Sequence, residues 1–310
     1  MNDIKITTTG SFPPLKSELH EDSEAEVSIK NAMEKQIEAG VDILVDGQVR
    51  SDIVGIFARS IGLEGYGLPY HVHKPIGKPT SSITLKDLQT AAKYAKGKPL
   101  TAHVTGPTVM AESCEFDEDI PDRYRGDKGF ENLTMDLAQA LAEETHLIAN
   151  EAKKLGIGYL QIDEPSLVYG ADLDLANRAM QTITDVWRNE AGGEIILHAC
   201  GSIEEIWLDL LKMPVDVLNL ESLHLRDLDD KKIKSFRDSD KHLSLGVIRV
   251  NSDVIPSPQR VAKEIIYTAD RLGMDRIWGI TPACGLRLST SDMAFKRMRC
   301  LVDARNKLAQ

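Results

Sequence analysis

The chain has 310 residues, of which 42% are hydrophobic and 27% are charged, as is usual for a soluble globular protein. Its formal net charge of −11 argues against nucleic acid or an anionic membrane as the main partner, because both require a basic surface. The first residues, MNDIKITTTG, are too polar for a secretory signal, and no apolar run is long enough to cross a membrane. Four cysteines do not make a disulfide framework, so we expect a protein of the reducing cytoplasm.

Eight short runs rich in apolar and β-branched residues are predicted to be strands, at residues 6–10, 42–47, 99–106, 159–165, 194–200, 215–222, 242–248 and 276–284. Helical sequence follows these runs, most clearly at residues 26–40, 131–156, 202–213 and 257–273. This alternation favours a (β/α)8 barrel over an open doubly wound sheet, which stays an alternative because the pairing of the strands is not visible in the sequence. We expect one domain over residues 1–310.

Two segments interrupt the alternation, one after the second predicted strand and one after the third. Residues 62–82 are rich in Gly, Pro and His and are predicted to be a hairpin or loop insertion. Residues 112–132 are acidic. A long loop at this end of a barrel is typical of a lid or a partner surface, and a solvated excursion is the alternative.

Four potential metal ligands lie near the carboxyl ends of predicted strands: His198, Cys200, Glu221 and Cys284. Such ends converge on one rim of a parallel barrel, and residues two apart in a strand point the same way, so His198 and Cys200 could chelate together. Two sulfurs, an imidazole and a carboxylate form a plausible tetrahedral Zn²⁺ site. Cys114, in the acidic insertion, and Cys300, within the last predicted helix, are poorer ligands.

The charge of this ligand set indicates what the metal would do. Two thiolates and a carboxylate more than neutralise Zn²⁺, which makes it a poor activator of water but leaves it able to bind a substrate thiol as the thiolate. We therefore expect a zinc-dependent alkyl transfer to a thiol, in which the substrate sulfur takes a coordination position, with Glu221 as the ligand that it could displace.

Further polar residues at the strand ends are candidates for substrate binding. Asp163 could pair with a substrate ammonium group, while its neighbour Glu164 should face the opposite way, because adjacent strand residues alternate. Ser11, in the sequence TTTGSFPP, could hold a carboxylate together with backbone N–H groups. The alternative for Asp163 and Glu164 is an acid pair at the start of a helix. The alternative for Ser11 is a plain turn.

The motifs TTTGSFP, DGQVRSDIV, VTGP, QIDEP, HAC, NLES, IPS and TPACGLRLST, in this order, resemble the catalytic barrel of cobalamin-independent methionine synthase. The resemblance covers essentially the whole chain. It implies that His198, Cys200, Glu221 and Cys284 bind zinc, and that Ser11, Gln48 and Asp163 bind homocysteine. The implied activity is methyl transfer to homocysteine, which forms methionine.

Three departures from the family's pattern concern the methyl donor. Gln48 stands where the family has a glutamate, no tryptophan follows the VTGP motif, and Asn251 stands where the family has a histidine that is proposed to help protonate the folate leaving group. These departures predict a methylated corrinoid donor, as a protein or as methylcobalamin, rather than methyltetrahydrofolate. The alternatives are alkyl transfer to another thiol such as coenzyme M, a non-catalytic zinc- or thiol-binding barrel, and a lyase or decarboxylase that uses Asp163 and Glu164.

Overall fold

The computed structural model describes residues 4–15, 22–65, 67–79, 81–116 and 118–308. Its main sheet is parallel and has eight strands in the order β1-β10-β9-β8-β7-β6-β4-β2. The strands are β1 (Lys5–Ile6), β2 (Leu44–Val45), β4 (Leu100–Thr105), β6 (Ile157–Asp163), β7 (Glu194–His198), β8 (Val217–Glu221), β9 (His242–Ile248) and β10 (Ile277–Pro282). Each lies within or overlaps one of the eight predicted runs, so the predicted strands are confirmed.

The sheet curls into a barrel because its two edge strands meet. The backbone N–H groups of Asp42 and Ile43 donate to Ile6 O at 2.9 and 3.1 Å, and the Thr7 hydroxyl donates to Ile43 O at 3.0 Å. These bonds link the β1 end of the sheet to the β2 end. The expected (β/α)8 barrel is therefore confirmed, and the open doubly wound alternative is not.

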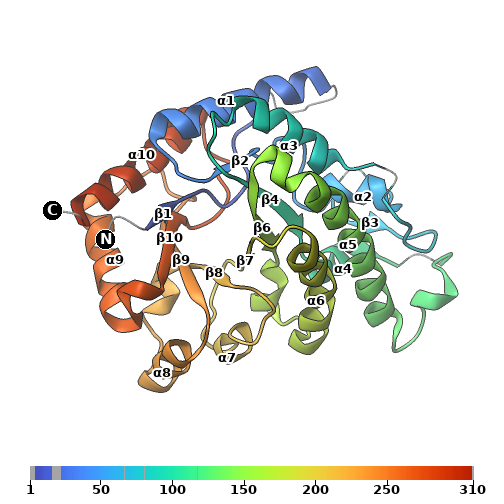
Figure 1. The fold of residues 1–310 in the computed structure, drawn as a ribbon. Helices are drawn as coiled ribbons and strands as arrows, with labels where there is room; N and C mark the ends of the chain where they lie inside the picture. The colour runs from blue at the N-terminus through green and yellow to red at the C-terminus, as the bar shows by residue number, and fades with distance from the viewer. Residues whose placement is uncertain (1–3, 16–21, 66, 80, 117, 309–310) are drawn as a thin grey trace.

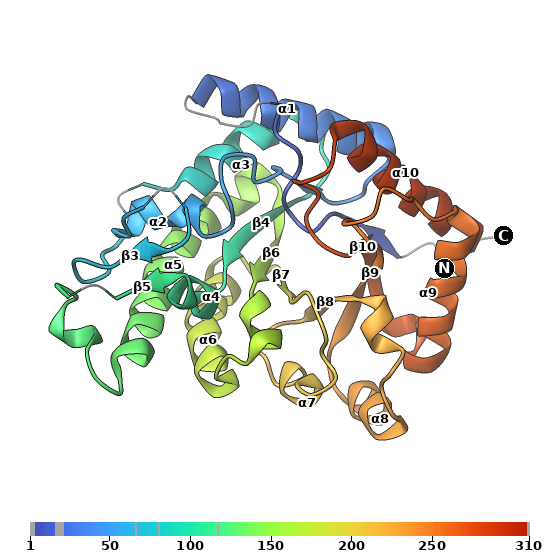
Figure 2. The same ribbon diagram turned by 180° about the vertical axis from the view of Figure 1, so that it is seen from behind.

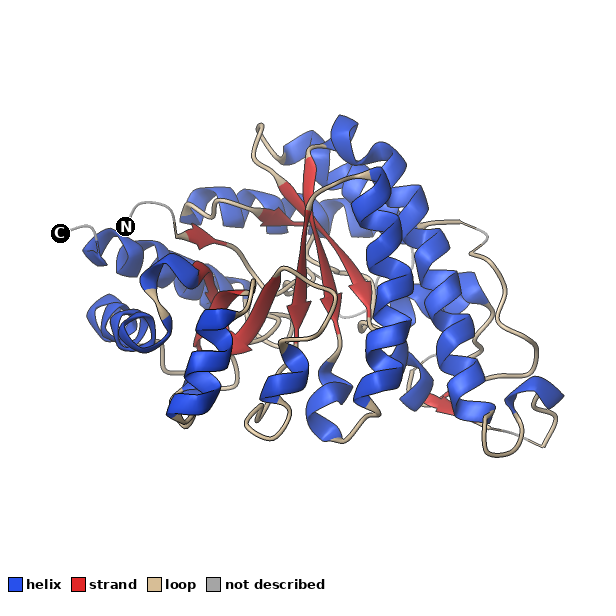
Figure 3. Ribbon diagram, turned by 60° about the horizontal axis from the view of Figure 1, so that its bottom comes forward, coloured by secondary structure: helices blue, strands red, loops and turns tan. Residues whose placement is uncertain are grey.

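Helices run around the outside of the sheet (Figure 1) and surround its fan of strands (Figure 3). The α-helices are α1 (Asp22–Ala39), α2 (Gly55–Ile61), α3 (Ile83–Tyr94), α4 (Pro107–Glu112), α5 (Gly129–Leu155), α6 (Leu173–Glu190), α7 (Trp207–Leu210), α8 (Asp230–Asp238), α9 (Pro258–Leu272) and α10 (Ser291–Leu308). Apolar side chains of the helices and of the outer face of the sheet form the main core. Among the described residues, no helix has the length and apolarity that crossing a membrane requires.

Local sequence explains where several helices begin and end. Ser257 caps α9, since its hydroxyl accepts a hydrogen bond from the Arg260 N–H at 3.3 Å, and Pro258 occupies the first turn. Gly156 ends α5 in the left-handed conformation. The helix predicted at residues 202–213 was too long, because only Trp207–Leu210 is α-helical and Pro214 disfavours a helical Met213.

The two insertions pair with each other rather than forming independent loops. Strand β3 (Tyr70–His71) lies in the first insertion and β5 (Cys114–Glu115) in the second, and they form a small parallel sheet beside α2 and α4 (Figure 2). His71 also forms an antiparallel bridge with Glu64. The predicted hairpin or loop at residues 62–82 is therefore only partly correct.

Candidate metal and substrate site

The interior of the barrel becomes more polar toward the carboxyl ends of the strands. Alternate residues of a strand share one face, so each interior row can be followed along its strand. The rows on three neighbouring strands are Tyr159, Gln161 and Asp163 on β6, Ile196 and His198 on β7, and Val217, Asn219 and Glu221 on β8. The lower residues Ile196 and Val217 belong to an apolar cluster with Ile43 and Trp278. This apolar cluster lies directly beneath the polar residues at the carboxyl ends of the strands.

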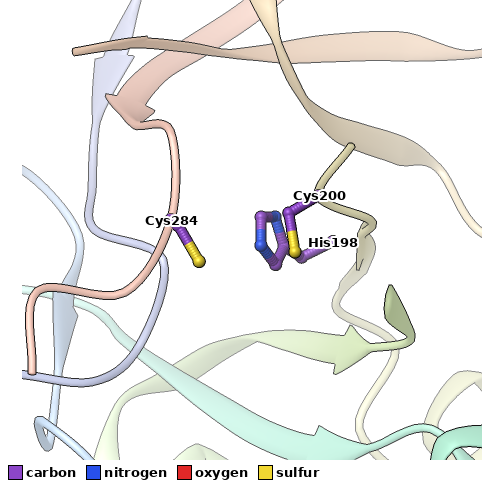
Figure 4. Close-up of side chains that lie close together, drawn as sticks. All are labelled: His198, Cys200 and Cys284. Atoms are coloured by element: carbon purple, nitrogen blue, oxygen red, sulfur yellow. The ribbon is translucent and has the colours of Figure 1, made fainter. Parts of the chain in front are cut away.

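His198, Cys200 and Cys284 form a candidate metal-binding group. Their ligand atoms all lie within 4.8 Å of one another. His198 ends β7, Cys200 follows it in the next loop, and Cys284 follows β10 on the other side of the site (Figure 4). Cys284 is far from His198 and Cys200 in the sequence but lies close to them in space, because β7, β8, β9 and β10 are consecutive neighbours in the sheet.

The His198 imidazole is oriented for ligation by Asn219. Its Nδ1 lies 3.3 Å from the backbone oxygen of Asn219 and 3.2 Å from the side-chain oxygen of the same residue. Both neighbours are acceptors, so Nδ1 carries a proton, and in the neutral ring the lone pair is on Nε2. Nε2 is buried without a hydrogen-bond partner among the described residues. A histidine held this way by an outer acceptor is the usual arrangement of a metal ligand.

The two thiols of the group differ in their acidity. A hydrogen bond from Cys200 lowers the pKa of the Cys284 thiol well below its usual range, burial opposes this shift, and His198 lowers the pKa further. The same Cys200–Cys284 contact, reinforced by burial, raises the pKa of the Cys200 thiol. Burial lowers the pKa of His198, but Cys284 and Asp163 outweigh it and raise the pKa. One sulfur of the pair is therefore readily available as a thiolate, the form that binds soft metals.

Glu221 lies at the end of β8 but outside the group of three. Its Oε2 is 3.8 Å from His224 Nε2, and its side chain is 23% exposed. Glu221 also lines a cavity that opens between β8, β9 and α9. Cys114 and Cys300 do not belong to the candidate group in the described part of the chain.

Asp163 and Gln48 lie on the other side of His198. Burial raises the pKa of Asp163 to about 6, while His198 and the neighbouring side-chain amides of Gln161 and Gln48 lower it. Asp163 Oδ1 accepts a hydrogen bond from Gln161 Nε2 at 2.7 Å, while its Oδ2 is buried without a partner among the described residues. One carboxylate oxygen is thus left to receive a donor from elsewhere.

Gln48 has an unusual backbone conformation that brings its side chain over Gly10. Its φ is 42°, in the left-handed region, and Arg287 Nη1 donates to its carbonyl oxygen at 3.1 Å. A Cβ at Gly10 would lie only 2.4 Å from Gln48 Oε1 and 3.2 Å from His103 Cδ2. Position 10 must therefore be glycine for these two side chains to reach the site.

Ser11 lies against the loop that carries Cys284. Its carbonyl oxygen accepts a hydrogen bond from the Leu286 N–H at 2.7 Å. A Cβ at Gly285 would come within 2.1 Å of the Ser11 hydroxyl. Ser11 is therefore next to Cys284, while Gln48 and Asp163 approach the same group of three residues from the β2 and β6 sides.

Two residues of the site were not predicted from the sequence, Asn219 and His103. Asn219 lies at an interior position of β8, and His103 lies at an interior position of β4 between Thr101 and Thr105. His103 is 2% exposed, and neither of its ring nitrogens has a hydrogen-bond partner in the described residues. Burial lowers the pKa of His103 to about 3, so its imidazole is neutral. Interior polarity within a strand run was the signal that could have identified both.

The fold and this group of residues define a (β/α)8 barrel with a candidate His/Cys/Cys metal site at the carboxyl ends of its strands. Residues 7–307 match the family model described as the catalytic domain of cobalamin-independent synthase. A protein named methionine synthase from Methanothermobacter marburgensis is 32% identical over 89% of this chain and 87% of its own length. This chain belongs to the cobalamin-independent methionine synthase family and is a methyltransferase.

Two more distant relatives complete the comparison. The solved structure of a B12-independent methionine synthase from Shewanella sp. W3-18-1, in complex with selenomethionine, has a TM-score of 0.79 and 19% identity, and the match covers 99% of this chain and 98% of that one. This similarity supports the fold. A 5-methyltetrahydropteroyltriglutamate–homocysteine methyltransferase from Thermotoga sp. strain RQ2 is 26% identical over 96% of this chain, which spans 43% of its length.

Proposed function

We propose that this protein transfers a methyl group to the sulfur of homocysteine and forms methionine, with Zn²⁺ held by His198, Cys200 and Cys284. The observation that carries the proposal is the His198 imidazole, which offers a ring nitrogen within 4.8 Å of two cysteine sulfurs. Asn219 holds its Nδ1, and its Nε2 is buried without a partner among the described residues. Imidazole and thiolate ligands suit Zn²⁺. Zinc bound there supplies the Lewis acidity that keeps a thiol deprotonated at neutral pH. Glu221 is the proposed fourth ligand.

The residues around the group provide complementary charges for an amino-acid thiol. Asp163 Oδ2, buried and without a partner among the described residues, is an acceptor for the substrate ammonium group. Ser11, next to Cys284, is proposed to donate to the substrate carboxylate. Gln48 lies next to Asp163 and stands where the family has a glutamate. Asp163 is therefore the acid that we propose for the one ammonium group of the substrate. This pairing favours homocysteine over a thiol that has no amino group.

The comparisons do not support the corrinoid donor that we expected. The family model is described as cobalamin-independent, and the Thermotoga relative is named for a methylated pteroyltriglutamate. We therefore propose a methyltetrahydropteroylglutamate-type donor. In that reaction an S–C bond forms, the N5–C bond of the donor breaks, the thiol gives up its proton and the departing nitrogen gains one.

A methylated corrinoid is the second candidate, and Asn251 is the specific observation in its favour. Asn251 is exposed, and a neutral amide cannot supply the proton that a departing nitrogen requires. A corrinoid leaving group needs no proton, because the cobalt keeps the electron pair of the broken Co–C bond.

The test is methionine formation from homocysteine with either 5-methyltetrahydropteroyltriglutamate or methylcobalamin, with and without a chelator. We expect zinc-dependent turnover, with the pteroyltriglutamate as the better donor. Turnover that persists after complete removal of zinc would refute the metal assignment, and absence of methionine with both donors would refute the reaction. A clear preference for methylcobalamin would establish the second candidate.

A further inference from the structure

The turn that carries Gln48 has a backbone conformation that a residue with a side chain rarely adopts. Among the described residues, Gln48 and Lys96 are the two non-glycine residues with a positive φ, and they differ in burial. Lys96 is exposed, whereas Gln48 is 5% exposed and has a φ of 42°. Backbone strain of this kind persists only where the surrounding contacts impose it, and it clusters at functional sites.

Two hydrogen bonds hold this turn from within and from the segment after β1. Asp46 Oδ1 accepts a hydrogen bond from the Gln48 N–H at 3.1 Å. The Gly47 carbonyl oxygen accepts one from the Phe12 N–H at 2.7 Å. These bonds fix the start of the turn, but neither involves the carbonyl group of Gln48.

Arg287 supplies the missing contact from the loop that follows β10. Its Nη1 donates to the carbonyl oxygens of Gln48 at 3.1 Å and of Val49 at 3.0 Å. The side chain is partly buried and forms no salt bridge with any residue in the described part of the chain. A hydrogen bond from a charged donor is stronger than one from a neutral donor, and two acceptors on successive residues fix the direction of both peptide groups.

The segment 284–287 connects this contact with the metal group. It begins with Cys284, one of the three grouped ligands, and ends with Arg287 on the Gln48 turn. Between them, the Leu286 N–H donates to the Ser11 carbonyl oxygen at 2.7 Å. One short segment is therefore attached to the candidate metal group and to the turns that carry Ser11 and Gln48.

We propose that Arg287 is a positioning residue that holds Gln48 in its left-handed conformation and thereby sets the preference for a thiol with an amino group. The inference rests on the proposed function, which assigns Asp163 to the substrate ammonium group. In the observed conformation the Gln48 side chain lies over Gly10 and next to Asp163. Without the contact from Arg287, the turn can relax to a negative φ, which moves the Gln48 amide away from Asp163.

Binding to the zinc-loaded protein, measured by calorimetry without a methyl donor, tests this inference. Homocysteine is compared with 4-mercaptobutyrate, which lacks only the amino group. We expect the wild type to bind homocysteine about tenfold or more tightly than the analogue. Arg287→Met should lose most of this preference, because its affinity for homocysteine falls while its affinity for the analogue stays within about twofold of the wild type.

Arg276→Met is the matched control. Arg276 is also partly buried and donates to backbone carbonyl oxygens, those of Arg237 at 3.1 Å and of Ser239, but it precedes β10 at the opposite end of the strand. This variant should keep the preference of the wild type. If Arg287→Met does not fold, Arg287→Gln, whose shorter side chain cannot reach both carbonyl oxygens, takes its place with the same expectation.

A double variant separates positioning of Gln48 from a general structural role. Gln48→Gly removes the side chain, and glycine adopts a positive φ without strain. If Arg287 acts through Gln48, the addition of Arg287→Met to Gln48→Gly should change the affinity for homocysteine by less than about twofold.

The inference alone is overturned if the wild type prefers homocysteine and Arg287→Met keeps that preference. Equal weakening of both thiols in Arg287→Met, or an undiminished effect in the Gln48→Gly background, would overturn it as well. A wild type with no preference for homocysteine would count against the amino-group pocket of the proposed function and would remove the inference with it. Failure of methyl transfer alone would count against the proposed reaction and leave the binding result standing.

Discussion

Asp163 and Glu164 are adjacent in the chain, yet their carboxylates have opposite surroundings. Asp163 ends β6 inside the barrel and keeps one oxygen without a partner among the described residues. Glu164 points outward and accepts hydrogen bonds from the backbone N–H groups of Thr108 at 2.9 Å and Val109 at 2.8 Å, and from the Ser166 hydroxyl at 2.5 Å. The alternation of the strand therefore assigns one acid to the site and the other to holding the start of α4.

The fixed position of Glu164 makes Gly106 intolerant of any side chain. A Cβ at position 106 would lie 2.1 Å from Glu164 Oε2, and three hydrogen bonds prevent that carboxylate from moving away. We expect Gly106→Ala to lower the free energy of unfolding by about 2 kcal/mol or more, as measured by chemical denaturation. Gly158→Ala is the matched control, because nothing lies within 4 Å of its Cβ position. Equal stability of the two variants would contradict the packing described here.

Asp163→Asn should weaken the binding of homocysteine by removing the charge that faces its ammonium group. A hydrogen bond between charged groups contributes about 1.5–3 kcal/mol, so KM for homocysteine should rise about tenfold to a hundredfold. The diagnostic comparison uses 4-mercaptobutyrate, which is homocysteine without the amino group. The variant should use this analogue about as well as the wild type does. A parallel loss for both thiols would mean that Asp163 supports the metal group rather than the ammonium.

Cys284→Ser should release the metal and abolish methyl transfer while leaving the barrel folded. The hydroxyl is a poor ligand for Zn²⁺, and Cys284 lies in a loop after β10 rather than in the core. Zinc content by mass spectrometry, turnover and circular dichroism would be measured together. Cys114→Ser is the matched control, since Cys114 lies in β5 outside the candidate group, and it should retain zinc and activity. Full zinc content in Cys284→Ser would remove this residue from the proposed site.

The fold could be predicted because strand runs and helical runs alternate eight times along the chain. The residue types in these runs favour the strand or helix that the structure contains there. His198, Cys200 and Cys284 could be predicted as a group because they follow strands that are neighbours in a barrel. Assignment of residues 1–310 to one domain stays a prediction, as do the ligand role of Glu221 and the substrate-binding roles of Ser11, Gln48 and Asp163.

Other features depend on side-chain direction and on distant contacts, which periodicity does not encode. Asn219 and His103 occupy interior positions of their strands, and the role of a polar residue there can be assigned only once its neighbours across the barrel are known. The pairing of β3 with β5 joins two segments that are more than forty residues apart and share no obvious pattern. Glu221 ends its strand as predicted, but its carboxylate lies 3.8 Å from His224 Nε2 and is not part of the group of three ligands.

His103 should make the folded state sensitive to acid. Its pKa is lowered to about 3 by burial, whereas an unfolded histidine titrates near 6.5, so only the unfolded chain takes up the proton between these values. The stability that neutral His103 contributes is complete above pH 6.5 and is lost as the pH falls toward 3. Relative to the wild type, His103→Leu should gain about 3 kcal/mol between pH 7 and pH 4. A pH-independent difference in the free energy of unfolding would show that His103 is accessible to protons in the folded state.

Glu144 should have the opposite effect. It lies in α5, and its Oε1 accepts a 2.5 Å hydrogen bond from the hydroxyl of Ser82, which in turn caps α3 by accepting from the Leu85 N–H. Its other oxygen is buried without a partner among the described residues. Burial raises the pKa of Glu144 from 4.5 to about 7, and the Ser82 hydrogen bond only partly offsets this shift.

The pKa of Glu144 is about 7 in the folded state and 4.5 in the unfolded chain, and these two pKa values set how stability changes with pH. At pH 8 the Glu144 carboxyl is ionised in both the folded and the unfolded state, so the folded state is destabilised by a buried carboxylate. As the pH falls from 7 to 4.5, Glu144 in the folded state takes up a proton first, and this destabilisation disappears. Glu144→Gln keeps an oxygen acceptor for Ser82, so it should be more stable than the wild type by about 3 kcal/mol at pH 8, and the difference should vanish near pH 4.5. Glu143→Gln alters a partly exposed carboxylate paired with Lys78 and serves as the control. If Glu144→Gln instead destabilises the protein at pH 8, the negative charge at this position is favourable and the burial argument fails.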